Sequence, residues 1–317
     1  MEQKSTSPRR LAYVLNPAAG KGKYLPDARR AAEQARADIV HLTERQGDCI
    51  DFIAEPCLRD PDTHFVVYGG DGTAGEAATG IMRAGAGSRA ILTVVPCGSG
   101  NDFARGMAGF PPPSGEDARF IDLIAVNGRY VINMMNIGFD CDVVAESERL
   151  RRKRQLPNSL SYIAGIGSVL AHKETFCTTV QLFGVAGEGT EELHDEVVEG
   201  DFLLTAAANL PYCGGGFNAA PAADPSDGFM DVLLVRDISR ARFLSLVGSY
   251  RKGTHVNPET CTPYPPFKDI LEYRHCRTLR LDGVKRICLD GEIIPATGVH
   301  ADVVPKAVRC TPMAKGG

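Results

Sequence analysis

The chain has 317 residues, a length that suits two domains of average size, each with its own buried core. A composition of 44% hydrophobic and 23% charged residues is typical of a globular protein and excludes a disordered or collagen-like chain. The formal net charge of -4 argues against a general nucleic-acid binder, because such proteins carry a basic excess over a face or a domain.

The cysteine pattern and the hydropathy of the chain indicate its cellular compartment. The ten cysteines are scattered singly, without the spacing of a zinc site or a redox pair, and favour reduced thiols in a cytoplasm. The first residues, MEQKSTSPRR, lack the apolar core of a secretory signal. The most apolar stretches, such as 90–97 and 162–171, are shorter than the roughly 20 residues that span a bilayer. We therefore expect a cytoplasmic protein without a transmembrane segment, which would reach a membrane substrate from the surface.

The first part of the chain alternates strand-like and helix-like segments. The expected strands are 11–15, 38–43, 63–68 and 90–95, and the expected helices are 26–37, 50–58 and 73–84. Pro56 interrupts the second of these helices, so the pattern does not fix its ends. The alternation predicts an α/β domain built on a parallel sheet, which we assign to residues 1–128.

Beyond about Phe120 the pattern changes to short strands. Asn127-Gly128 is a hairpin signal between two of them. Helical stretches are expected at 159–172 and 239–250, and further strands at 201–209, 230–238, 278–283, 285–292 and 301–311. We expect a second, β-rich domain over residues 129–298.

The segment VVYGGDGT, residues 66–73, is an apolar strand that runs into a glycine turn and opens a helix. Glycines allow close approach of the backbone to a ligand, and the free N–H groups of a helix start attract phosphate oxygens. Asp71 would repel a bare phosphate, so its presence implies Mg²⁺ between the two. A plain strand-to-helix turn is the competing interpretation.

The segment PCGSGNDF, residues 96–103, also joins a strand end to a helix start. Ser99 and Asn101 offer hydrogen-bond donors and Asp102 a second carboxylate, although Asn and Asp are also ordinary helix caps. Loops at the carboxyl ends of neighbouring parallel strands face one crevice, where open α/β sheets bind ligands. A third loop, NPAAGKG at 16–22, resembles a phosphate loop without matching its pattern, so nucleotide contact and a simple turn stay open.

Taken together, NPAAGKG, GGDGT, PCGSGNDFAR and the distant LDGE at 289–292 resemble the diacylglycerol kinase catalytic family, which includes bacterial lipid kinases and sphingosine kinases. NIGFD at 136–140 and DPSDGFMDV at 224–232 extend the resemblance over nearly the whole chain. It implies an NAD kinase-like fold, in which an α/β ATP-binding domain precedes a β-sandwich-like, lipid-binding domain. The active site would lie in the cleft, and residues 299–317 would return to the first domain.

The resemblance also implies roles for individual residues. The ATP-binding positions would be Asn16, Thr43, Gly69, Gly70, Asp71, Gly72, Thr73, Gly98, Ser99, Gly100, Asn101 and Asp102. Asp290 and Glu292 match the catalytic acidic pair, one of which would accept the proton of the lipid hydroxyl, with Asp71 assisting. Asp71, Asp102 and Asp140 would hold the catalytic Mg²⁺.

A second, structural Mg²⁺ is implied at the DPSDGF segment, bound by Asp224, Asp227 and the carbonyl of Phe229, although a tight turn explains the same residues. One departure from the family pattern is Gly75, where many relatives have Asn, and loss of that amide could weaken a nucleotide contact. The basic run 149–154 is either a solvated face or a docking site for anionic lipid.

The expected function is therefore that of an ATP- and Mg²⁺-dependent lipid kinase that phosphorylates a hydroxyl of diacylglycerol or a related lipid. It would act while transiently peripheral to the inner face of the membrane, and family relatives are often homodimers. Two alternatives remain from the sequence: an NAD kinase-like nucleotide kinase, and a non-catalytic lipid- or nucleotide-binding protein on the same fold. The acidic residues argue against the second alternative, because a binding protein needs no base.

Overall fold

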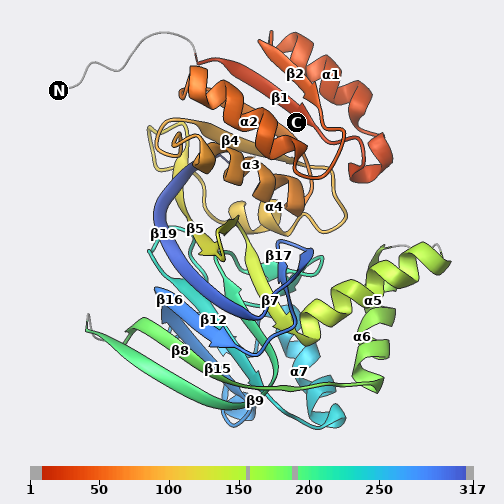
Figure 1. Cartoon of the computed structure of the whole chain (residues 1–317), viewed down its shortest axis with the longest axis vertical. Coiled ribbons are helices and arrows are strands. Elements are labelled where there is room, and N and C mark those ends of the chain that lie inside the picture. The colour runs from red at the N-terminus through yellow and green to blue at the C-terminus, as the bar shows by residue number, and fades with distance from the viewer. Residues whose placement is uncertain (1–8, 155–157, 188–191, 312–317) are drawn as a thin grey trace.

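The structure is a computed structural model that describes residues 9–154, 158–187 and 192–311. It has an α/β part at one end and a β-rich part at the other (Figure 1). The first sheet has the parallel order β2-β1-β3-β4, formed by β1 (Leu11–Leu15), β2 (Ile39–Leu42), β3 (His64–Gly69) and β4 (Ile91–Pro96). The expected parallel α/β architecture is thus confirmed.

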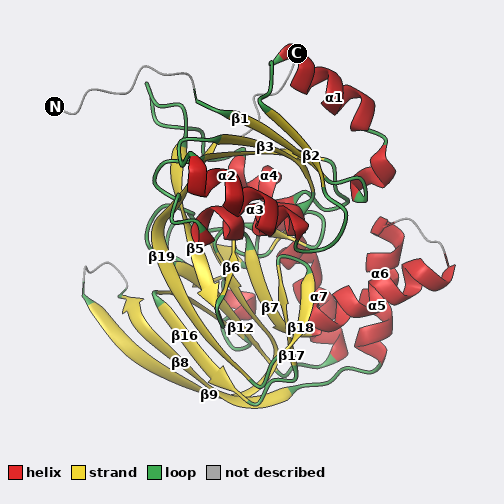
Figure 2. Cartoon of the chain, turned by 45° about the horizontal axis from the view of Figure 1, so that its top comes forward, coloured by secondary structure: helices red, strands yellow, loops and turns green. Residues whose placement is uncertain are grey.

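Helices cover both faces of this sheet (Figure 2). They are α1 (Leu25–Gln34), α2 (Asp48–Arg59), α3 (Asp71–Arg83) and α4 (Asp102–Met107), with a 3₁₀ turn at Ala19–Gly22. Side chains alternate along β1: Ala12 and Val14 pack in the core with α2 and α3, whereas Tyr13 and Leu15 pack in the core with α1. Pro56 does not interrupt α2, which continues through it to Arg59.

The remaining strands lie in the β-rich part or extend into it. They are β5 (Arg119–Val126), β6 (Arg129–Val131), β7 (Met134–Gly138), β8 (Phe176–Ala186), β9 (Leu193–Ala208), β10 (Tyr212–Cys213), β11 (Phe217–Asn218), β12 (Met230–Arg236), β13 (Val256–Asn257), β14 (Thr262–Pro263), β15 (Leu271–Cys276), β16 (Thr278–Asp282), β17 (Arg286–Leu289), β18 (Glu292–Pro295) and β19 (Gly298–Thr311). Asn127 and Gly128, both with positive φ, form the expected hairpin turn between β5 and β6.

Three helices accompany these strands. They are α5 (Phe139–Arg154), α6 (Asn158–Ala171) and α7 (Arg240–Lys252), and a 3₁₀ turn lies at Pro265–Phe267. The sequence predicted α6 and α7 but missed α5, whose second half is almost entirely charged and has no apolar stripe. Tertiary packing stabilises the helix instead, because α5 packs along α6 in a helical hairpin that projects from one side of the molecule (Figure 1).

Strand β19 joins the two parts of the molecule. It pairs antiparallel with β16 and β5 and then parallel with β4, where Arg309 lies opposite Ile91 (Figure 1). Its course bends between Val304 and Val308, at the point where Lys306 has a positive φ. The end of the chain thereby extends the first sheet by one strand. Among the described residues, no helix is long and apolar enough to cross a membrane.

Candidate active site

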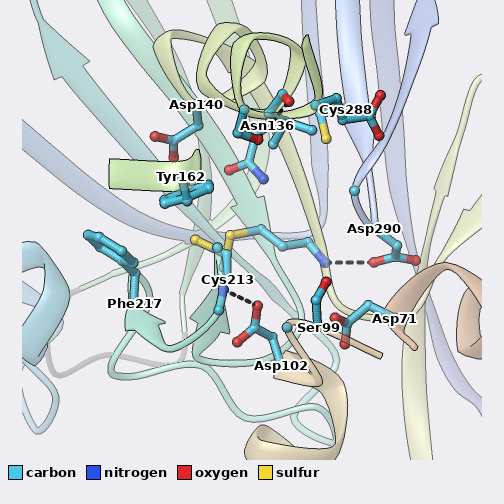
Figure 3. Close-up of a pocket in the computed structure, with 18 of the residues that line it drawn as sticks. Asp71, Ser99, Asp102, Asn136, Asp140, Tyr162, Cys213, Phe217, Cys288 and Asp290 are labelled. Atoms are coloured by element: carbon cyan, nitrogen blue, oxygen red, sulfur yellow. Dashed lines mark hydrogen bonds between the residues drawn. The ribbon is translucent and has the colours of Figure 1, made fainter. Parts of the chain in front are cut away.

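Two cavities meet in the cleft between the parts. The larger has a volume of about 1310 Å³ and is lined by the loops after β1, β2, β3 and β4. The smaller, of about 320 Å³, lies toward the β-rich part and is lined by β7, α5, α6 and the β10–β11 turn (Figure 3). Both are lined by Asp71, Ser99, Gly100, Asp290 and Gly291. A group bound in one cavity can therefore reach a group bound in the other.

The two glycine loops predicted from the sequence lie against each other, because β3 and β4 are adjacent parallel strands. A Cβ built on Gly98 would lie only 2.6 Å from the Cα of Gly70, so this approach requires glycine. Asn101 braces the second loop, accepting a hydrogen bond from the Gly98 N–H at 2.8 Å. Its role in the structure is thus to shape the loop rather than to line the larger cavity.

Two carboxylates flank Gly100 on the floor of the cleft. A Cβ built there would lie 2.9 Å from Asp71 Oδ2 and 3.1 Å from Asp102 Oδ2. The Phe103 N–H donates to Asp71 at 2.9 Å, and the Gly215 N–H donates to Asp102 at 2.7 Å. Burial raises the pKa of both carboxyls, and the charge of Asp71 further raises the pKa of Asp102. Such a pair suits a hard cation, which would relieve the repulsion.

Asp290 lies opposite this pair, in the two-residue turn between β17 and β18. The interpretation of Asp-Gly as a hairpin turn is therefore confirmed, and Asp290 has the positive φ of 47° that such a turn demands. Its Oδ1 accepts the N–H groups of Asn133 at 2.9 Å and Met134 at 3.0 Å, and its Oδ2 accepts that of Ile132 at 2.9 Å. Burial raises the pKa of Asp290 to about 7.

Glu292 lies on the other side of the turn. Its side chain is 38% exposed and pairs with Arg129 at 3.3 Å. It faces a third groove, which Gly72, Glu76 and Asp290 also line. It lines neither of the two cavities that meet at Asp290. The structure thus separates the two acids that the sequence could not rank, and places Asp290 at the junction.

Comparisons with known proteins identify the family of the chain. Residues 10–128 match the family described as the diacylglycerol kinase catalytic domain. Residues 133–311, more than half of the chain, match the YegS C-terminal NAD kinase beta sandwich-like domain. The chain belongs to the diacylglycerol kinase and YegS-like lipid kinase family.

Individual relatives cover nearly the whole chain. It is 26% identical over 302 residues to "Diacylglycerol kinase" of Bacillus subtilis, covering 90% of this chain and 93% of that protein. It is 28% identical over 313 residues to "Probable lipid kinase YegS-like" of Yersinia pestis, covering 94% of this chain and 95% of the relative. A crystal structure of a diacylglycerol kinase from Bacillus anthracis superimposes with a TM-score of 0.64 at 17% identity, covering 95% and 96% of the two chains, and supports the fold.

Most nucleotide positions expected of this lipid kinase family line the larger cavity. They are Asn16, Thr43, Gly70, Asp71, Gly72, Thr73, Gly98, Ser99 and Gly100. Asn16 also donates to the hydroxyl of Thr73 at 2.8 Å and so ties the first loop to the glycine turn. Gly69 lies behind the turn, and Asp102 lines the smaller cavity instead. Sequence reasoning missed three cavity-lining cations, Lys21, Lys23 and Arg45, although Lys21 stands within NPAAGKG.

Asp140 lies apart from Asp71 and Asp102. It lines the smaller cavity from the first turn of α5 and accepts a hydrogen bond from Tyr250 at 3.1 Å. Burial raises its pKa to about 6. Across residues 9–154, 158–187 and 192–311, no three His, Cys, Asp or Glu side chains gather closely enough to hold a metal ion. A catalytic Mg²⁺ that involves Asp140 would need the nucleotide to complete its ligands.

The DPSDGF segment forms a compact turn before β12. Asp224 accepts the Ser226 N–H at 2.9 Å, and Asp227 accepts the Phe229 N–H at 2.9 Å. Burial, together with the charges of Asp231 and Asp224, raises the pKa of Asp227 to about 6. Asp122, which the sequence did not single out, accepts the Gly228 N–H at 2.7 Å. Both earlier interpretations, a tight turn and a Mg²⁺ site, are compatible with this arrangement.

Proposed function

We propose that this chain transfers the γ-phosphate of ATP to a hydroxyl group of a membrane lipid in a Mg²⁺-dependent reaction. The observation that carries the proposal is the position of Asp290 where the two cavities meet, opposite Asp71. The larger cavity has the glycine loops and the size for a nucleotide, and the smaller combines polar groups with aromatic side chains.

Asp290 is the better candidate for the general base. One oxygen, Oδ1, accepts two backbone N–H groups, whereas Oδ2 accepts one and keeps a lone pair for a proton. The carboxylate would take the proton of the lipid hydroxyl as that oxygen bonds to the γ-phosphorus, while the bond from phosphorus to the bridging oxygen of ADP breaks. The three N–H donors keep the carboxylate oriented throughout.

The acid pair beside Gly100 fits Mg²⁺, because carboxylate oxygens are its preferred protein ligands. When bound, Mg²⁺ would offset the charge of the phosphates. Asp227, with Asp224 and the carbonyl of Phe229, is our candidate for a separate structural Mg²⁺ site.

The side chains of the α5–α6 helical hairpin support the proposal that the acceptor is a lipid. Leu160 and Ile163 on α6 are 54% and 57% exposed, and Ile163 lines the smaller cavity. Large exposed apolar side chains at the mouth of a cavity favour contact with acyl chains. The basic residues Arg149, Arg152 and Lys153 lie on the neighbouring helix, where anionic head groups would attract them. We therefore infer transient association with the membrane surface through this hairpin.

The proposal is tested by incubating the protein with ATP labelled at the γ-phosphate and a total lipid extract, then identifying the labelled product. Labelled lipid that disappears when Mg²⁺ is chelated supports it. Parallel reactions with NAD separate this activity from that of a nucleotide kinase, and label in NADP alone would refute the lipid assignment. No transfer to any acceptor, with ATP binding intact, would instead indicate a binding protein.

A further inference from the structure

The segment that carries the β10–β11 turn packs onto α4 of the α/β part. The turn forms part of the wall of the smaller cavity. Leu210, just before β10, is buried in the same core as Phe103 of α4. A Cβ built on Gly106 would lie 3.2 Å from the Cβ of Leu210, so the helix and the segment are in close contact. This wall of the smaller cavity is therefore attached to the helix that carries Asp102.

Arg105 of α4 contacts both ends of the β10–β11 turn. Its Cζ lies 5.7 Å from the centroid of the Tyr212 ring, within the range of a cation–π interaction. At the other end of the turn, a Cβ built on Gly216 would touch the guanidinium at 3.4 Å. The same guanidinium pairs with Oδ1 of Asp102, three residues earlier in the helix. One side chain thus joins the turn to the acid pair.

The second oxygen of Asp102 also bonds to the turn. Oδ2 accepts the Gly215 N–H at 2.7 Å, a bond that Figure 3 shows. Asp102 is 4% exposed, and hydrogen bonds to a charged group are roughly twice as strong as those between neutral groups. We call these contacts of Arg105 and Asp102 with Tyr212 and Gly215 the Arg105 clamp.

Two hydrogen bonds connect the clamped turn to the candidate base. The carbonyl of Tyr212 accepts a hydrogen bond from Nδ2 of Asn133 at 2.9 Å. The backbone N–H of Asn133 donates to Asp290 Oδ1, also at 2.9 Å. Arg105 lies over the ring of the same Tyr212 and pairs with Asp102. The clamp therefore links the acid pair on one side of the cleft to Asp290 on the other.

We propose that Arg105 is a positioning residue for phosphate transfer: by holding the β10–β11 turn on α4, it fixes Asp290 relative to the acid pair beside Gly100. Arg105 lies outside the lining of both cavities, so it acts through other residues rather than on a substrate. A planar guanidinium suits this role, because it can pair with a carboxylate and lie over an aromatic ring at the same time. The inference rests on the proposed lipid kinase activity and adds a residue on which that activity depends.

The experiment compares kcat and the KM for ATP in the wild type and in Arg105→Met, with the lipid that the wild type phosphorylates. We expect kcat to fall by about tenfold or more, because a displacement of about 1 Å at a catalytic group can cost up to about 100-fold. The KM for ATP should stay close to that of the wild type, since Arg105 does not line the larger cavity. Arg105→Lys keeps a charge beside Asp102 but has no planar group to lie over Tyr212, and should recover only part of the loss. A wild-type kcat in Arg105→Met would overturn the inference.

A double-mutant cycle with Tyr212→Leu tests whether the effect passes through the turn. If Arg105 acts through Tyr212, the double variant should be scarcely slower than the slower of the two single variants. Losses of kcat that multiply in the double variant would overturn the proposed connection.

Arg236→Met is the matched control. Arg236 also pairs with an acid, Glu272, and its Cζ lies 5.4 Å from the centroid of the Phe202 ring, but it lies outside the lining of both cavities. The side chains of Arg236 and Arg105 are 36% and 41% exposed, so the two substitutions are comparable. Arg236→Met should lower the melting temperature and leave kcat unchanged. An equal loss of kcat in both variants would overturn the inference, because lost stability would explain it. Absence of phosphate transfer to any lipid by the wild type would instead refute the proposed function.

Discussion

The carboxylate of Asp290 occupies the space that a side chain at position 75 would need. A Cβ built on Gly75 would lie 2.7 Å from Asp290 Oδ2, well inside contact distance. Gly75 belongs to α3 and does not line the larger cavity. The departure from the family pattern at this position therefore concerns the candidate base rather than the nucleotide. Without a side chain there, Asp290 can lie directly against the helix that begins at Asp71.

Replacing Gly75 by Ala should displace the carboxylate of Asp290. A displacement of about 1 Å at a catalytic group can cost up to about 100-fold in rate, and we expect kcat to fall between tenfold and that limit. The KM for ATP should change little, because Gly75 does not line the larger cavity, where we propose that ATP binds. Steady-state kinetics with varied ATP checks both expectations.

Gly80→Ala is the matched control for this variant. It lies in the same helix, and its Cβ would meet the carbonyl of Ile50 at 2.8 Å and the Cβ of Ile53 at 2.9 Å. It should lower the melting temperature through overpacking while kcat stays near that of the wild type. If Gly75→Ala loses stability but keeps its kcat, Gly75 has only a packing role.

Neutralising Asp290 and Glu292 one at a time should show which of the two carboxylates is the general base. Asp290→Asn should lower kcat by about 10²–10⁴-fold, the usual contribution of a general base. Glu292→Gln should have a smaller effect, because Glu292 is partly exposed and lies outside both cavities. ATP binding, measured by calorimetry, should survive in both variants. A larger loss of kcat in Glu292→Gln would move the base to Glu292.

The pH dependence should follow the ionisation of Asp290. Its pKa is raised from 3.8 to about 7, and only the deprotonated form can accept a proton. We expect kcat/KM to rise with pH and to level off near or above pH 7, with Mg²⁺ near Asp71 drawing the midpoint downward. A rate that is flat between pH 5 and pH 8 would show that no group titrating in this range is required for activity.

The same pKa shift predicts that the free energy of unfolding changes with pH. A carboxyl whose pKa is higher in the folded than in the unfolded state stabilises the fold through its protonated form. For Asp290 this contribution is complete below pH 3.8 and is lost as the pH rises through about 7. The free energy of unfolding, measured with urea, should therefore vary with pH between 3.8 and about 7 in the wild type. In Asp290→Asn it should vary less over the same range.

Removal of Mg²⁺ tests the structural site at the DPSDGF turn. If Asp227 binds Mg²⁺, adding the ion at 100 times its Kd should stabilise the fold by about 2.7 kcal/mol and raise the melting temperature accordingly. Chelation should reverse the shift, and Asp227→Asn should abolish it. Asp71→Asn, which changes the acid pair beside Gly100, should retain the shift. If Mg²⁺ shifts the melting temperature equally in the wild type and in Asp227→Asn, the DPSDGF segment is a tight turn and not a Mg²⁺ site.

Docking through α5 is tested with Arg149, Arg152 and Lys153 replaced together by Gln. Arg151 is kept, because it lines both cavities and its loss would confuse docking with catalysis. Each basic residue near an anionic surface contributes about 1 kcal/mol, so activity on anionic vesicles should fall strongly while activity in neutral detergent micelles is spared. Replacing Arg29, Arg30 and Lys268 by Gln removes the same charge elsewhere and should spare both. Equal losses in vesicles and micelles would exclude docking through this face.

The sequence alone determined the parallel α/β architecture, the pairing of the two glycine loops and the turn at Asp290. Each depends on a local pattern: alternating apolar runs for the sheet, glycines at strand ends for the loops, and Asp-Gly for the hairpin. Adjacent loops at one edge of a sheet then follow from strand order, because parallel neighbours end on the same side.

Only the tertiary structure decided which of the two acids lies where the two cavities meet, and which residues surround it. The hydrogen bond from Asn133 to Asp290 joins residues 157 positions apart, and the contact between Gly75 and Asp290 joins the two parts of the molecule. Helix α5 could not be predicted from the sequence, because it lacks an apolar stripe and is stabilised by packing against α6. Local patterns reflect backbone preference and burial, whereas a catalytic cleft is made by distant segments whose meeting depends on the packing of the whole chain.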